Sequence, residues 1–162
     1  MASELRTGTF ESTLDDKGRV VIPASLRESY QGKLVITYGW YSCVWIQTID
    51  EYETFMKNME LNLTSSMMSN DQYEAFQYLL DSPATEAVID SKSGRIPIPA
   101  AIRTHIGLSK DCLVLSINRH LRHLEIWNTE AYHTHMNQMQ MKVQDAMQNL
   151  GPVHFFPKEG QV

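Results

Sequence analysis

Short apolar runs alternate with segments of helical periodicity along this chain, a pattern that predicts strands mixed with helices. Runs rich in β-branched and aromatic residues predict strands over 20–22, 34–37, 43–46, 112–117 and 124–127. Pro23 and Pro99 cannot lie inside a central strand but suit the first turn of a helix. We therefore expect short helices from Ala24 to about residue 30 and from Ala100 to about residue 106, the second capped by Gly107.

Three longer segments carry apolar residues three or four positions apart, which is the spacing of one face of a helix. The expected N-caps of these helices, in chain order, are Asp50, either Asn70 or Asp71, and Thr129. The third helix should end at the Gly-Pro pair that follows residue 150. Its methionines have near-heptad spacing, so this face could cover either its own domain or a neighbouring subunit.

One stretch of sequence occurs twice. The first copy reads DDKGRVVIPASLR over residues 15–27, and the second reads DSKSGRIPIPAAIR over residues 90–103. From the Gly-Arg pair to the last arginine the offset is constant at 76 residues, from 18 to 94 and from 27 to 103. The second copy has one extra residue in Ser91-Lys92-Ser93, so its aspartate precedes its arginine by five positions instead of four.

Each copy predicts the same local structure, which is a strand, a turn, a return strand, a short helix and a strand hairpin. Gly18 and Gly94 mark the turns, where a positive φ is expected. The extra residue should give the second turn a different shape. Two copies are too few for a solenoid, so we expect a pseudo-twofold domain in which each half covers the apolar face of the other.

The pattern Asp-x-Lys-Gly-Arg-Val-x-Ile-Pro-x-x-Leu-Arg resembles the signature of the SpoVT/AbrB swapped-hairpin superfamily, and its tandem arrangement resembles the MraZ family. The resemblance implies an α+β fold in which two pseudo-symmetric, AbrB-like βαββ repeats form a double-split β-barrel with flanking helices. The implied segments are 8–53 for the first repeat, 54–84 for linking helices, 85–128 for the second repeat, 129–150 for a C-terminal helix and 151–162 for a tail.

The same resemblance implies a function. Proteins of this family are bacterial transcription factors that form ring-shaped homo-oligomers and bind short G-rich direct repeats in double-stranded DNA, upstream of the division and cell-wall gene cluster. The implied DNA-binding residues are Lys17 and Arg19, with Gly18 for the turn and Asp15 as an orienting residue. Lys92 and Arg95 are implied as weaker contributors, because the second copy departs from the family's Asp-to-Arg spacing.

Composition and charge narrow this expectation. The chain of 162 residues is 43% hydrophobic, enough for a real core in one domain or two small ones. The net charge of −5 argues against a generally basic nucleic-acid binder. Residues 41–84, however, hold seven acids and one base, so the bases elsewhere can still form a local patch. This acidic segment should face away from any bound DNA.

Localisation follows from what the sequence lacks. The longest apolar runs are too short to span a bilayer, and the first 20 residues do not resemble a secretory signal. Cys43 and Cys112 are expected to be reduced, buried thiols. We therefore expect a cytoplasmic protein with no membrane partner, and the DNA binding that the resemblance implies would place it on the nucleoid.

A Lys-Gly-Arg turn has an ordinary interpretation, a solvated hairpin tip, but its recurrence in the same context favours a function. Arg19 in a major groove can bond bidentately to O6 and N7 of guanine, and Lys17 can neutralise a phosphate or reach a second guanine. Asp15 could orient the turn or hold Arg19 in one rotamer. For Arg27 and Arg103, a salt bridge near the edge of the core is at least as good an interpretation as a DNA contact.

Catalysis and metal binding find no support in the sequence. The six histidines do not stand at a recognisable metal-ligand spacing, and no nucleophile elbow, P-loop or dinucleotide fingerprint occurs. We expect no enzymatic activity, no cofactor and no metal. The alternative function is a protein-binding module on the same fold, antitoxin-like or an assembly scaffold, with the acidic segment 50–81 meeting a basic partner. Two copies and a short tail favour the regulator.

Overall fold

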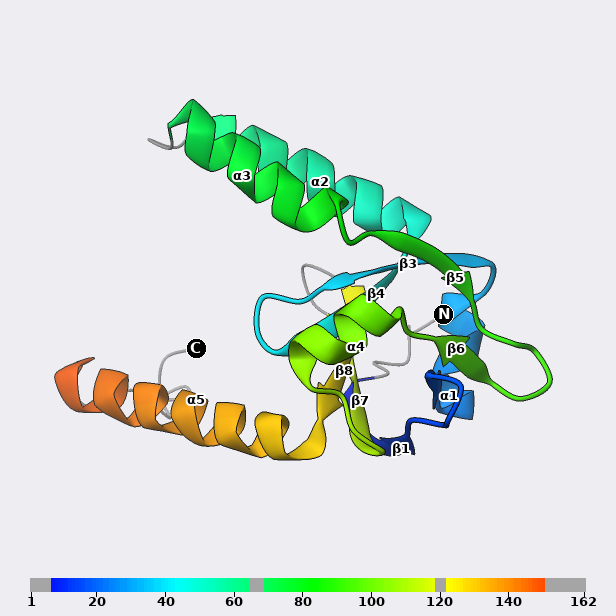
Figure 1. The fold of residues 1–162 in the computed structure, drawn as a ribbon. Helices are drawn as coiled ribbons and strands as arrows, with labels where there is room; N and C mark the ends of the chain where they lie inside the picture. Colours follow the sequence, from blue (N-terminus) through cyan, green and yellow to red (C-terminus); the bar gives the residue numbers. More distant parts are fainter. Residues whose placement is uncertain (1–6, 65–68, 119–121, 151–162) are drawn as a thin grey trace, which may run out of the picture. The chain divides into compact units, whose positions relative to one another are not determined.

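The computed structural model describes residues 7–64, 69–118 and 122–150 (Figure 1). The first repeat contains β1 (Gly8–Thr13), β2 (Arg19–Val21), α1 (Ala24–Arg27), the 3-10 turn η1 (Glu28–Tyr30), β3 (Lys33–Tyr38) and β4 (Cys43–Thr48). Two helices follow, α2 (Ile49–Thr64) and α3 (Asn70–Asp81). The second repeat contains β5 (Thr85–Val88), β6 (Arg95–Pro97), α4 (Ala100–Ile106), β7 (Asp111–Asn118) and β8 (Arg122–Asn128), and α5 (Thr129–Leu150) comes last.

The chain divides into two compact units, residues 1–129 and residues 130–162. The first contains both repeats with α2 and α3. The second contains nearly all of α5, whose methionine-rich face includes the exposed side chains Met136, Val143 and Met147. The predicted tail, 151–162, lies outside the described residues. None of the described helices combines the length and hydropathy needed to cross a bilayer.

Most of the expected elements are present. The helix expected from Ala24 to about residue 30 is α-helical only as far as Arg27 and continues as the 3-10 turn η1. The other differences in the helices lie at their caps. The helix expected from Ala100 to residue 106 is confirmed, and Gly107 ends it in the left-handed conformation with φ of 61°. The cap expected for α3 is wrong: Ser69 accepts a hydrogen bond from the Gln72 amide and completes a capping box. The helices α2 and α5 begin at Ile49 and Thr129, so Asp50 and Thr129 lie within the helices that they were expected to cap. At the starts of both α2 and α3, a suitable polar residue lies slightly earlier in the sequence than the periodicity of the apolar positions indicated.

The strands of the two repeats pair with each other. A six-stranded antiparallel sheet has the order β1-β7-β8-β4-β3-β5, and a two-stranded ladder joins β2 to β6. The first strand of each repeat therefore pairs with a strand of the other repeat, β1 with β7 and β5 with β3. If each strand is replaced by its counterpart in the other repeat, the same order is obtained when it is read from the opposite edge of the sheet. This is the pseudo-twofold relation that the duplicated sequence predicts.

This exchange corrects the expected strand–turn–strand hairpin. The strands on either side of the first turn meet only at the Leu14–Val20 bridge, and β2 then pairs with β6. Each repeat also has two strands ahead of its short helix, so its order is ββαββ instead of βαββ. The α+β class with an antiparallel sheet is confirmed. The six-stranded sheet has two open edges, β1 and β5, so a closed double-split barrel is not.

The core lies where the two repeats cover each other. In the β2–β6 ladder Val20 faces Ile96, and both side chains are fully buried. Pairing β2 with β6 buries one apolar side chain from each repeat, which a local hairpin would not do. Each such side chain contributes roughly 1.5–3 kcal/mol relative to exposure. The same cluster contains Ile22, Leu26, Ile98 and Ile102 together with the inner faces of β3, β4, β7 and β8. Cys43 and Cys112 are buried and unpaired, as expected.

A partly buried acid, Glu125, lies on the other face of the sheet. Glu125 faces Trp45 across the β4–β8 pair and accepts hydrogen bonds from the indole N–H of Trp45 at 3.2 Å and of Trp127 at 2.8 Å. His123 Nε2 lies 3.0 Å from the same carboxylate. Burial alone would raise the pKa of Glu125, but the contacts with His123 and Trp127 outweigh it, so the pKa lies below its ordinary value. Nothing in the sequence pattern predicted this cluster.

Candidate nucleic-acid interface

The turn between β1 and β2, which we call tip 1 (residues 15–19), is organised by the carboxylate of Asp15. One oxygen, Oδ1, accepts from the backbone amides of Lys17 at 3.0 Å and Arg19 at 2.9 Å. The other, Oδ2, accepts from Arg19 Nε at 2.9 Å and lies 2.8 Å from Nη2. Hydrogen bonds from Arg19 hold the pKa of Asp15 below its ordinary value. One carboxylate thus fixes both the turn and the arginine rotamer, while Lys17 is exposed.

The turn between β5 and β6, which we call tip 2 (residues 90–95), forms the loop at the right of Figure 1 and has a different shape. The Gly94 amide bonds to the Asp90 carbonyl four residues back, whereas the Gly18 amide bonds to the Asp15 carbonyl three residues back. Asp90 Oδ1 accepts from the amides of Lys92 and Ser93 at 3.1 and 2.6 Å. These bonds, that of Ser93 foremost, lower the pKa of Asp90. The expected difference between the turns is confirmed.

The β2–β6 ladder brings the two tip arginines to one surface. Side chains alternate across a strand, so the ladder that buries Val20 and Ile96 presents Arg19 and Arg95 on its opposite face. Each arginine side chain is 36% exposed. Arg95 Nε lies 3.4 Å from Asp15 Oδ2, so the Asp15 carboxylate forms ion pairs with one arginine from each repeat. The sequence did not predict this sharing, because Asp15 and Arg95 belong to different copies.

The backbone angle favours glycine at both tips, and a side chain at either position would displace an arginine of the other repeat. Gly18 has φ of 74° and Gly94 has φ of 67°, which L side chains rarely adopt. A Cβ on Gly18 would also lie only 2.6 Å from Cζ of Arg103, and one on Gly94 would collide with the guanidinium of Arg27. The guanidinium of each short helix therefore packs directly on the tip of the other repeat.

The salt bridge considered for Arg27 and Arg103 is not present among the described residues. Arg27 Nε donates to the Ile22 carbonyl at 2.7 Å, and Arg103 Nε donates to the Ile98 carbonyl at 3.0 Å. Each arginine spans five residues back to the segment that leads into its own helix. The equal Gly-to-Arg distance of nine residues in both copies was the available signal for a paired role.

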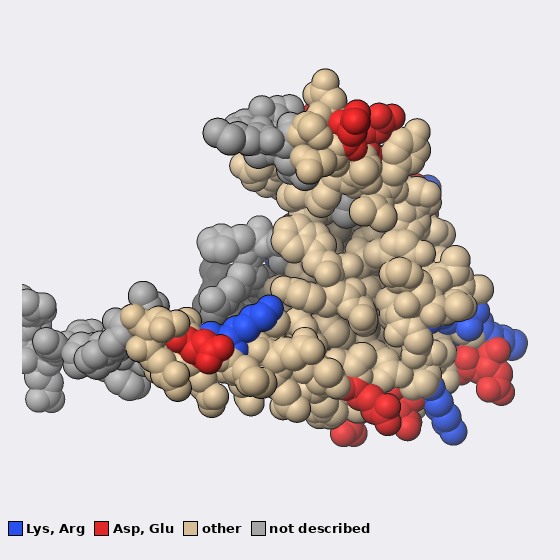
Figure 2. All heavy atoms as spheres, turned by 60° about the vertical axis from the view of Figure 1, so that its left-hand side comes forward, with Lys and Arg blue, Asp and Glu red and all other residues tan. Residues whose placement is uncertain are grey.

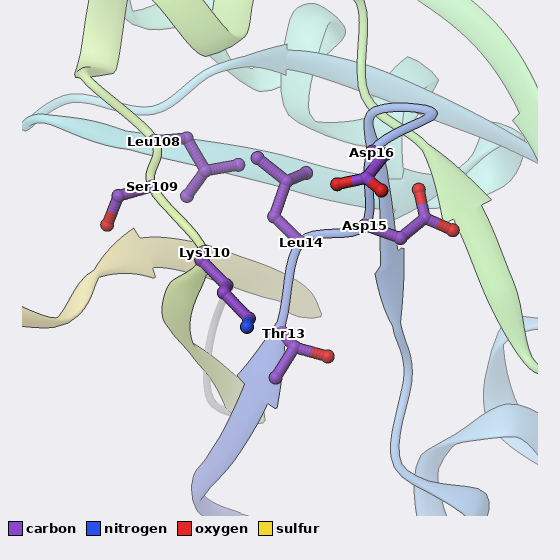
Figure 3. Close-up of a pocket in the computed structure, with 7 residues that line it drawn as sticks. All are labelled: Thr13, Leu14, Asp15, Asp16, Leu108, Ser109 and Lys110. Atoms are coloured by element: carbon purple, nitrogen blue, oxygen red, sulfur yellow. The ribbon is translucent and has the colours of Figure 1, made fainter.

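A pocket of about 520 Å³ lies beside the base of tip 1 (Figure 3). In Figure 3 the side chains of Leu14 and Leu108 point toward each other, and the carboxylates of Asp15 and Asp16 lie beyond them. The Leu14 amide donates to the Lys110 carbonyl at 2.9 Å, which ties the base of the tip to the loop after α4. Tip 1 is therefore supported by the second repeat at its base as well as at its glycine.

Charge is distributed unevenly over the first unit. The two tips and the two short helices together carry six basic and three acidic side chains within 15–27 and 90–103. The helices α2 and α3 carry seven acids and one lysine. Figure 2 shows acidic side chains over the helical pair at the top, and both signs together at the lower right. The basic surplus thus belongs to the tips together with the short helices, which add Arg27 and Arg103, although the whole chain is acidic.

These groups can recognise an anionic, hydrogen-bonding surface. Two guanidinium groups on one face offer planar donors for base edges or phosphates, and Lys17 and Lys92 add exposed ammonium groups. In the part of the chain that the structure describes, no three His, Cys, Asp or Glu side chains converge to hold a metal ion.

The chain is similar in sequence to known proteins. The family model described as "MraZ protein, putative antitoxin-like" matches residues 5–72 and 80–150. A protein of Treponema denticola named "Transcriptional regulator MraZ" is 33% identical over 150 residues, covering 92% of this chain and 99% of its own length. Proteins of the same name from Thermoanaerobacter sp. and Saccharopolyspora erythraea are 32% and 34% identical. They cover 88% and 90% of this chain, and 94% and 96% of their own lengths.

Proposed function

Since the chain belongs to the MraZ family, we propose that it is a transcriptional regulator that binds short G-rich direct repeats in double-stranded DNA as a ring-shaped homo-oligomer. Its operator lies upstream of the division and cell-wall gene cluster, and the protein works in the cytoplasm on the nucleoid. The two repeats act as one swapped-hairpin unit, with segment boundaries at 8–53, 54–84, 85–128 and 129–150. No cofactor, metal or catalysis takes part.

The observation that carries this proposal is the outer face of the β2–β6 ladder. It presents Arg19 and Arg95 together, on a rigid base whose inner face is fully buried. Arg19 is held in one orientation by Asp15, which lowers the entropy that a base contact would cost. Arginine in this state can bond bidentately to O6 and N7 of guanine, and Lys17 can neutralise an adjacent phosphate.

A ring supplies the affinity that one chain lacks. A few phosphate contacts give weak, salt-sensitive binding. Several tips on one duplex raise the effective concentration of each contact. A cyclic head-to-tail ring presents its tips in one rotational sense, which fits direct repeats about one helical turn, roughly 10 bp, apart.

Selection of bound duplexes from a random DNA pool by the purified protein tests this function. The expected result is a short G-rich motif in tandem copies, which should also occur upstream of the division and cell-wall genes of the source genome. A pool that shows no enrichment contradicts DNA reading. A gel shift that needs an added basic protein would instead support the protein-binding alternative.

The first tip should carry most of the base reading. Replacing Arg19 with alanine should cost roughly 1–3 kcal/mol per engaged subunit and relax the preference at the guanine it contacts. Lys17→Ala should weaken binding more evenly across sequences and reduce the salt dependence, because a phosphate contact carries no base information. Titrations on the selected operator and on single-base variants measure both. Wild-type affinity for Arg19→Ala would remove tip 1 from the interface.

The second tip should contribute less. Arg95→Ala is expected to perturb binding far less than Arg19→Ala, because tip 2 is one residue longer and its Asp90 is occupied by backbone amides instead of orienting the arginine. The comparison requires variants of unchanged oligomeric state, checked by light scattering. Equal losses for the two variants would show that both tips read DNA.

A further inference from the structure

We propose that Arg103 and Arg27 are positioning residues that hold the tips crosswise, so that the helix of each repeat fixes the tip of the other. Arg103 of the second repeat holds tip 1, and Arg27 of the first repeat holds tip 2. The contact between a short-helix arginine and the tip of the other repeat is called a latch below. Its effect on DNA binding rests on the proposed function, but the contact itself can be measured in the free protein.

The latch for tip 1 consists of two contacts that share Ile98. The Ile98 amide donates to the Gly18 carbonyl at 2.9 Å, and the Ile98 carbonyl accepts from Arg103 Nε at 3.0 Å. The guanidinium so anchored lies against the Cα of Gly18, within the space that a Cβ would need. Tip 1 is therefore held by a hydrogen bond to its carbonyl and by a planar group packed on its glycine.

The latch for tip 2 repeats this arrangement with the repeats exchanged. The Ile22 amide donates to the Gly94 carbonyl at 2.8 Å, and the Ile22 carbonyl accepts from Arg27 Nε at 2.7 Å. The Arg27 guanidinium packs on Gly94. The same three-residue arrangement thus occurs at two turns of different length, so the contact does not depend on one particular turn.

Position in the chain explains why this role matters for recognition. Each glycine is adjacent to its tip arginine, so a shift of Gly18 moves the backbone of Arg19 directly. Arg19 is the first residue of β2, which is three residues long, so the buried ladder holds the chain only on the C-terminal side of Arg19. Loss of Arg103 should therefore loosen the tip and misplace Arg19, even though no atom of Arg103 is required to touch a base.

Hydrogen exchange in the free protein tests the latch without DNA. Arg103→Met keeps an apolar stem of similar length but removes the guanidinium. It should speed exchange of the Ile98 amide by about tenfold or more and leave the Ile22 amide unchanged. Arg27→Met should do the reverse and serves as the matched control. An unchanged Ile98 amide, or equal acceleration of both amides in either variant, would overturn the crosswise assignment.

A double-substitution experiment on the selected operator tests the effect on recognition. Arg103→Met should lower affinity by a factor of the order of ten and relax the base preference at the position read by Arg19. In an Arg19→Ala background the same substitution should change affinity by less than about twofold, because its effect passes through Arg19. Arg103→Lys should behave like Arg103→Met.

The outcomes separate the latch from a direct phosphate contact and from failure of the function. If Arg103→Lys retains wild-type affinity and Arg103→Met binds all sequences equally less well, Arg103 contacts phosphate and its positioning role is wrong. If Arg19→Ala itself leaves DNA binding unchanged, the proposed function of tip 1 fails, while the exchange of the Ile98 amide still decides the latch.

Discussion

Inserting about 5 bp between two adjacent operator repeats should lower the affinity of the assembled protein by about 10²–10⁴-fold. Half a helical turn rotates the second repeat to the opposite side of the duplex, where tips that share one rim of a ring cannot reach it. Each chain then binds through a few basic side chains alone, and such contacts are weak at physiological salt. Titrations against duplexes that differ only in the spacer measure this effect.

The matched control is an insertion of about 10 bp, which restores the face of the helix while lengthening the spacer. It should recover part of the lost affinity. Light scattering gives the size of the free assembly under the same conditions. A monomer that binds one isolated repeat as tightly as two would defeat the ring mechanism even if the selected motif were correct.

Replacing Glu125 with alanine should lower the free energy of unfolding by about 1–3 kcal/mol. The substitution removes the acceptor for two indole donors and the partner of His123 in the buried layer beside the sheet. Denaturant titration, followed by tryptophan fluorescence, measures the loss. Glu86→Ala is the matched control, since Glu86 pairs with Lys33 at 2.9 Å but is 60% exposed and should contribute less than about 1 kcal/mol. Equal losses would mean that burial of Glu125 adds nothing.

The Glu125 carboxylate should also make the folding stability depend on pH in the acid range. The pKa of Glu125 is lower in the folded chain than its ordinary value of 4.5. Its contribution to stability is therefore fully present above pH 4.5 and is lost as the pH falls through the lower, folded-state value. Glu125→Gln, which cannot titrate, should lack this part of the acid dependence. A variant whose stability falls in parallel with that of the wild type below pH 4.5 would assign the acid dependence to other carboxylates, such as Asp15.

Local chemistry accounts for what the residue pattern predicted correctly. Glycine at 18 and 94, proline at 23 and 99, and glycine at 107 each restrict or permit backbone angles within a few residues, so turns, helix starts and the C-cap follow from them directly. The duplicated segment likewise predicted the pseudo-twofold relation of the strands. Caps were harder, because several polar residues near each helix start could serve, and Ser69 competed successfully with Asn70 and Asp71.

Strand partners could not be predicted in this way. An apolar run with a period of two can pair with any strand that buries its inner face, so the pattern of 20–22 allows a local hairpin as readily as a ladder with 95–97. Burial of Val20 and Ile96 against one core decided for the ladder.

Every distinctive feature of the interface depends on that long-range choice. It placed Arg95 beside Asp15, Arg103 on Gly18 and Arg27 on Gly94. The turn at each tip is therefore specified locally, by Lys-Gly-Arg in tip 1 and by Lys-Ser-Gly-Arg in tip 2. The positions of the tips are set by contacts between the two repeats, which are offset by 76 residues, and these contacts form only when the whole chain folds.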